Sequence, residues 1–109
     1  MSRPAIHPGE ILAEELADLE LTPTELARQL KLPANRITQI IQGKWSISGD
    51  TALRLGHWFR TSGQFWLNLQ SAYDIRVAAQ EAGAEIARLP MRSALGTRRR
   101  RRAASRRMA

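Results

Sequence analysis

Cysteine is absent from this chain of 109 residues, and that absence excludes several classes of protein. Without cysteine there is no disulfide framework, no thiolate catalysis and no zinc finger of the cysteine type. Long apolar runs are missing too, since none approaches the roughly 18 residues that a membrane-spanning helix needs. No secretory hydrophobic segment follows the N-terminus. We therefore expect a single domain without a membrane span, located in the cytoplasm.

Catalytic constellations are missing as well. The chain has no glycine-rich phosphate loop, no HExxH sequence and no serine nucleophile that pairs with a base. His7 and His57 stand alone, with no carboxylate or second histidine at a spacing that suits a metal. The sequence therefore predicts neither an enzyme nor a metal site, and it indicates no cofactor.

Acidic residues are lacking from residues 98–109, which contain seven arginines. The whole chain has 17 basic and 10 acidic residues, so the formal net charge of +7 lies in this segment and residues 1–97 are formally neutral. We expect residues 90–109 to be a disordered basic tail that adds sequence-independent affinity for DNA. A solubilising extension and an RNA-binding segment stay open as alternatives.

Residues 21–44 have the pattern of two short helices joined by a tight turn. Thr22 and Glu25 form a predicted capping box for the first helix, with Pro23 at its first position. The second helix is predicted over residues 34–42, and Gly43 can end it in a left-handed conformation. The inward faces are apolar, with Leu26, Ala27 and Leu30 in the first helix and Ile37, Ile40 and Ile41 in the second. This pattern is typical of a helix-turn-helix and indicates DNA as a partner, the alternative being a helical hairpin with a solvated polar face.

The second of these helices carries side chains of the kinds that bind DNA. Four positions are expected to approach base edges, namely Ala34, Asn35, Arg36 and Gln39. Four others suit phosphate groups, namely Thr22, Thr24, Thr38 and Lys44. For Lys44 the alternative is a charge that stabilises the end of the helix. Trp45 follows the motif, and we expect it either in the core or against the sugar-phosphate backbone of DNA.

Three further helices are predicted around this motif, and no strand is. They cover residues 9–19, residues 49–60 and a segment that starts near Gly63, and Ser48 and Ser62 are placed to cap the last two. The first of the three should turn four apolar residues inward, namely Ile11, Leu12, Leu16 and Leu19. The predicted fold class is therefore all-α, with five helices.

The last predicted helix carries an apolar stripe made of Phe65, Trp66, Leu69 and Tyr73. A domain of about 80 residues has little core to cover such a stripe, and a symmetric pair of chains would bury it. We therefore assign residues 8–89 to a domain for DNA binding and homodimerisation, preceded by a flexible arm at residues 1–7.

Three sequence blocks carry a resemblance to a known family. They are PGEILAEEL at 8–16, TELARQLKLPANRITQIIQGK at 24–44 with DTALRLGHWF at 50–59, and TSGQFWLNLQSAYDI at 61–75. The chain resembles the HigA antitoxins, a VapI-like branch of the Xre/Cro-like helix-turn-helix proteins. It departs from that pattern at Trp45, where arginine is usual, at Pro33, where a capping serine or threonine is usual, and at Gly49. The arginine-rich tail has no counterpart in the family pattern.

The resemblance implies a lambda-repressor-like domain and a function. Such a protein is a dimer that binds an inverted-repeat operator in double-stranded DNA and represses its own operon. It also neutralises a HigB/RelE-like toxin that cleaves mRNA. Two alternatives stay open: a stand-alone Xre-family transcriptional regulator without a toxin, and a protein that coats nucleic acid through its tail.

Overall fold

Five α-helices make up the fold, and the computed structural model describes residues 5–93 of the chain. The helices are α1 (Pro8–Leu19), α2 (Pro23–Leu30), α3 (Arg36–Ile41), α4 (Gly49–Phe59) and α5 (Gly63–Ala87). No strand occurs in the described residues, so the all-α prediction is confirmed. The predicted tail falls mostly outside them, since residues 94–109 are not described. Within residues 5–93, no helix is both long enough and apolar enough to cross a membrane.

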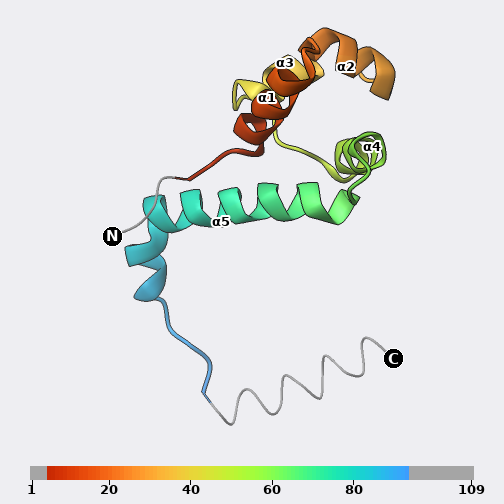
Figure 1. The fold of residues 1–109 in the computed structure, drawn as a ribbon. Coiled ribbons are helices and arrows are strands. Elements are labelled where there is room, and N and C mark those ends of the chain that lie inside the picture. The colour runs from red at the N-terminus through yellow and green to blue at the C-terminus, as the bar shows by residue number, and fades with distance from the viewer. Residues whose placement is uncertain (1–4, 94–109) are drawn as a thin grey trace, which may run out of the picture.

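The core lies where α1 to α4 pack together above the N-terminal half of α5 (Figure 1). Each helix contributes buried apolar side chains, and Leu12, Leu26, Ile37, Leu55 and Trp66 are among the most buried. Burial of one such side chain contributes about 1.5–3 kcal/mol relative to its exposure. The C-terminal part of α5 projects beyond this bundle (Figure 1). The bundle therefore holds α3 rigidly while one long helix extends away from it.

The first helix begins with a cap that the sequence analysis did not anticipate. The Nδ1 atom of His7 accepts a hydrogen bond from the Gly9 N–H at 2.9 Å, and the Glu10 carboxylate accepts one from the His7 N–H at 2.9 Å. His7 is buried and is the N-cap of α1, so it is not part of a loose arm. At the other end of the helix, Leu19 is 51% exposed, and its predicted inward position is wrong.

The two motif helices follow the prediction with small shifts. The Thr22 hydroxyl accepts a hydrogen bond from the Glu25 N–H at 3.1 Å, which confirms the cap of α2. The reciprocal half of the capping box differs, because the Glu25 carboxylate accepts from the Thr22 hydroxyl at 2.9 Å. α3 begins at Arg36, two residues later than predicted, because residues 34 and 35 form a turn.

The end of α3 is a glycine-dependent turn, as predicted. Gly43 has a φ of 74°, in the left-handed region. The Lys44 N–H donates to the Gln39 carbonyl at 2.9 Å and the Gly43 N–H donates to the Ile40 carbonyl at 3.0 Å. These two bonds form a Schellman motif, which satisfies carbonyls that the helix leaves unpaired.

Three other helices end on a charged residue in a left-handed conformation. Glu20, Lys31 and Arg60 have φ values of 52°, 58° and 60° and follow α1, α2 and α4. Glycine is the residue that adopts this conformation without steric cost. The backbone N–H of each donates to carbonyls of the preceding turn, so the hydrogen bonds are made despite the unfavourable φ.

The last two helices begin where the sequence placed them. The Ser48 hydroxyl accepts from the Thr51 N–H at 3.3 Å, and the Ser62 hydroxyl accepts from the Phe65 N–H at 3.0 Å. α5 then continues to Ala87. Both predicted serine caps are therefore confirmed.

Close helix contacts depend on two glycines. A Cβ atom on Gly9 would lie 2.0 Å from the Ile40 carbonyl oxygen, so α1 rests directly on the backbone of α3. A Cβ atom on Gly56 would lie 2.5 Å from the Ser62 carbonyl carbon, where the chain turns from α4 into α5. Gly9 thus sets the distance between α1 and α3.

Candidate nucleic-acid interface

α3 has one buried face and one face that solvent can reach. Ile37 and Ile40 are fully buried and fix the helix in the core. Arg36, Thr38 and Gln39 are half-buried on the other face. Ala34 and Asn35 are exposed in the turn that precedes the helix. The structure therefore brings the four predicted base-reading residues to the surface at the start of one short helix.

Arg36 lies against an aromatic ring. Its guanidinium carbon is 4.9 Å from the centroid of the Trp45 ring, which is within the range of a cation–π interaction. Trp45 is 45% exposed, so the interpretation that places it in the core is wrong. The Gly43 turn reverses the chain after α3, and Trp45 comes to lie beside the helix that it follows.

The predicted phosphate contacts have different surroundings. Lys44 and Thr24 are exposed, and Thr38 is half-buried on α3. The Thr22 hydroxyl, however, donates to the Glu25 carboxylate. A carboxylate in the first turn of α2 stabilises that helix through its dipole, but it repels a phosphate at the same place. Of the four residues, Thr22 is therefore the least suited to donate to phosphate.

The loop between α3 and α4, residues 42–48, is attached to α5 by a residue that the sequence analysis missed. Gln70 is 4% exposed, and its Oε1 atom accepts a hydrogen bond from the Ile47 N–H at 2.8 Å. Its Nε2 atom donates to the Asp74 carboxylate at 3.0 Å. Gln70 therefore fixes the loop that carries Lys44 and Trp45.

The same region of α5 contacts the N-cap of α1. The ring of Tyr73 meets the ring of His7 edge-on, with centroids 4.8 Å apart. Burial lowers the pKa of His7 below its ordinary value, and this outweighs the nearby carboxylates of Asp74 and Glu10, which raise it. Neutral His7 is the form that can accept a hydrogen bond at Nδ1, so the environment favours the cap.

The predicted dimer stripe does not form one exposed surface. Trp66 is 2% exposed and donates through Nε1 to the Thr61 hydroxyl at 3.1 Å, so it is a core residue with almost no area for a partner. Leu69 and Tyr73 are half-buried, and only Phe65 is exposed. The expected role of Trp66 as a dimer contact is therefore corrected to a core position.

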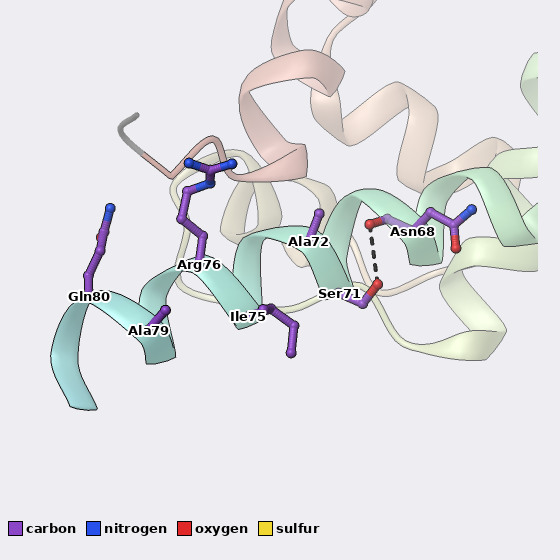
Figure 2. Close-up of a pocket in the computed structure, with 7 residues that line it drawn as sticks. All are labelled: Asn68, Ser71, Ala72, Ile75, Arg76, Ala79 and Gln80. Carbon is purple, nitrogen blue, oxygen red and sulfur yellow. Dashed lines mark hydrogen bonds between the residues drawn. The ribbon is translucent and has the colours of Figure 1, made fainter. Parts of the chain in front are cut away.

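A different face of α5 is open. A surface groove of about 680 Å³ runs along it, lined by Asn68, Ser71, Ala72, Ile75, Arg76, Ala79 and Gln80 (Figure 2). Ile75 is 71% exposed, and Ala72 and Ala79 flank it at steps of three and four residues. This spacing places the three apolar side chains on one side of the helix.

Comparisons with known proteins agree with this architecture. No protein-family model matches the chain. Virulence-associated protein I of Dichelobacter nodosus is 47% identical over 79 residues, which are 72% of this chain and 73% of that protein. A solved addiction-module antidote protein of the HigA family, from Coxiella burnetii, has a TM-score of 0.80 and 48% identity over 84% of this chain and 100% of its own. The chain belongs to the HigA family.

Two further relatives extend the comparison. The structure of the antitoxin HigA of Pseudomonas aeruginosa with the higBA promoter has a TM-score of 0.77 and 43% identity, over 80% of this chain and 97% of that one. The HTH-type transcriptional regulator YddM of Escherichia coli is 30% identical over 75% of this chain and 85% of its own length. These relatives are regulators and antitoxins rather than enzymes, in agreement with the prediction that this HigA-family chain is not an enzyme.

Proposed function

We propose that the chain is a DNA-binding antitoxin that represses its own operon and neutralises a HigB/RelE-like toxin that cleaves mRNA. The observation that carries the DNA-binding part is the position of Asn35, Arg36 and Gln39. All three reach the surface at the start of a helix whose other face is locked in the core. The solved complex of P. aeruginosa HigA with its promoter supports this part.

Each group on this surface has a defined partner in the major groove. The Arg36 guanidinium can bind O6 and N7 of a guanine with two parallel hydrogen bonds. The amides of Asn35 and Gln39 can do the same with N6 and N7 of an adenine, and the Ala34 methyl group can contact a thymine methyl. Thr24, Thr38 and Lys44 then fix the register by contacts to phosphates, which carry no sequence information.

The dimer that the family implies fits the open face of α5. Ala72, Ile75 and Ala79 provide a narrow apolar strip that a second copy could cover, with small residues that allow a close approach. A two-fold pair would place two α3 helices about 34–36 Å apart, one turn of DNA, and would read an inverted repeat. We propose this strip, with Phe65, in place of the stripe predicted from the sequence.

Toxin neutralisation rests on family membership. We propose that the toxin binds by protein contacts away from α3, so that operator binding and toxin binding use different surfaces. Growth arrest by a co-expressed small RelE-like protein encoded beside this gene, relieved by this chain, supports the proposal. Operator binding without such a neighbour, or without relief, favours a stand-alone transcriptional regulator.

We propose that the basic tail increases the affinity of the chain for DNA. If all seven arginines of residues 98–109 met phosphates, the slope of log affinity against log salt would steepen by roughly six units. That effect carries no preference for sequence, so removal of the tail should weaken binding to operator and to scrambled DNA alike.

Fluorescence anisotropy with salt titration tests the DNA proposal. The promoter fragment upstream of the gene is compared with scrambled DNA, for the full chain and for a chain that ends at Thr97. We expect both chains to prefer the promoter, and Arg36→Ala to lose about 1–3 kcal/mol of that preference per half-site. Arg92→Ala is the matched control, because it removes one charge from an exposed position outside the helices. Equal binding of promoter and scrambled DNA by the full chain would overturn the repressor part.

A further inference from the structure

Trp45 is held in place by its neighbours in the chain. The Schellman motif at Gly43 fixes the residues before it, and the buried Ile47 fixes those after it through the hydrogen bond from its N–H to Gln70. The indole is nevertheless 45% exposed, although an aromatic ring of this size gains most from full burial. Its place beside α3 is therefore set by the turn and the loop, not by the core.

The ring of Trp45 contacts a charged side chain of α3. The guanidinium carbon of Arg36 lies 4.9 Å from the centroid of the Trp45 ring. Within residues 5–93, this guanidinium makes no hydrogen bond or ion pair. Because no protein acceptor in residues 5–93 uses its N–H donors, the Arg36 guanidinium keeps them available for a base. An arginine held this way keeps the fork that matches guanine and loses less conformational freedom when it binds.

We propose that Trp45 is a positioning residue that fixes the conformation of Arg36 and thereby contributes to the choice of operator sequence. This inference rests on the proposed DNA-binding function. A ring that only added contact area to the DNA backbone would strengthen binding to every sequence equally. A ring that acts through Arg36 strengthens binding only where a base accepts the guanidinium. The two roles therefore differ in what they do to specificity.

The test begins with selection of binding sites from a pool of random DNA duplexes by the full-length protein. Anisotropy then measures affinity for the selected site and for scrambled DNA. We expect Trp45→Ala to weaken binding to the selected site by about two- to fivefold per half-site, the value of an exposed cation–π contact. Affinity for scrambled DNA should stay unchanged, and selection with the variant should lose preference at one symmetric base-pair position.

Two matched variants distinguish the effect of the aromatic ring from the effect of side-chain volume. Trp45→Phe keeps an aromatic face and should behave like the wild type. Trp45→Leu keeps apolar volume without that face and should behave like Trp45→Ala. Circular dichroism and urea midpoints establish that each variant is folded.

A double-mutant cycle with Arg36→Ala decides between the two roles. If Trp45 acts through Arg36, then Trp45→Ala causes no further loss in the Arg36→Ala background. An equal loss in both backgrounds, or an equal loss on scrambled DNA, overturns the inference and makes Trp45 a direct backbone contact. If the wild type enriches no sequence at all, the proposed function itself fails, and that result is distinct from either outcome.

Discussion

The contact between Gly9 and α3 predicts a large loss of stability for a very small substitution. In Gly9→Ala the new methyl group would lie 2.0 Å from the Ile40 carbonyl oxygen and 2.8 Å from the Ile41 Cα atom. Both are backbone atoms, which cannot rotate away, so α1 and α3 must separate by about 1 Å. Overpacking of this kind costs about 1–3 kcal/mol or more, against a gain of about 0.5–1 kcal/mol because alanine favours a helix.

The net loss for Gly9→Ala should therefore be about 1–2 kcal/mol, which corresponds to a fall in Tm of roughly 5–15 °C for a domain of this size. Urea denaturation followed by far-ultraviolet circular dichroism measures it. Gly49→Ala is the matched control, since it also lies at a helix start but would meet no atom within 4 Å. That control should be neutral or more stable by about 0.5–1 kcal/mol. A Gly9→Ala protein as stable as the control would refute the close packing of α1 on α3.

Three further perturbations follow from contacts of α5 and of the first helix cap. Gln70→Leu should lower the free energy of unfolding by about 1–3 kcal/mol, because the buried Ile47 N–H loses its acceptor, and the same urea titration would detect it. Because burial depresses the pKa of His7 in the folded chain below the ordinary 6.5, only the unfolded chain takes up the proton as pH falls below about 6.5. The free energy of unfolding should then decrease as the pH falls toward the pKa of His7 in the folded chain, and it should level off below that pKa. In His7→Asn, the asparagine can cap the helix but does not titrate, so this part of the pH dependence should disappear. Ile75→Glu should change the stability of the monomer by no more than about 0.5 kcal/mol, because the side chain is 71% exposed. The same variant should reduce dimer formation, which sedimentation experiments measure. An unchanged mass distribution would exclude this face of α5 as the dimer interface.

Local signals in the sequence predict the local features of the fold. The caps at Thr22, Ser48 and Ser62 and the left-handed Gly43 follow from residue type and spacing within one helical turn, and all four are present. Such features depend on bonds between residues three to five positions apart. They could be predicted because nothing distant has to be known.

Features that depend on distant partners could not be predicted in this way. The burial of Gln70 accompanies its hydrogen bond from the Ile47 N–H, 23 residues earlier, and the His7 ring packs against the distant Tyr73. Leu19 has the right helical spacing for the core, but α1 ends there and no neighbouring helix covers the side chain. The periodicity of apolar residues identifies which face of a helix is apolar. How much of that face is buried depends on where the neighbouring helices pack.

The candidate interface also has a part that the sequence could predict and a part that it could not. Residue type and position placed Arg36 and Gln39 on the accessible face of a helix-turn-helix, since that face is fixed by the buried Ile37 and Ile40. The contact of Arg36 with Trp45 could not be predicted, because it depends on the direction in which the chain leaves the Gly43 turn.

The left-handed residues that end α1, α2 and α4 bear on the lifetime of the protein. A non-glycine residue in this conformation costs on the order of 1 kcal/mol or more, and Glu20, Lys31 and Arg60 all adopt it. Three such costs are a large share of the roughly 5–15 kcal/mol by which a native domain is stable. Compared with a chain that had glycine at these three positions, this chain is less stable and populates unfolded forms more often. Proteases degrade those unfolded forms. A ligand that binds only the folded chain lowers the unfolded fraction, and it does so more strongly the further its concentration exceeds its Kd. The abundance of this protein would then depend on how much of it is bound to its partner.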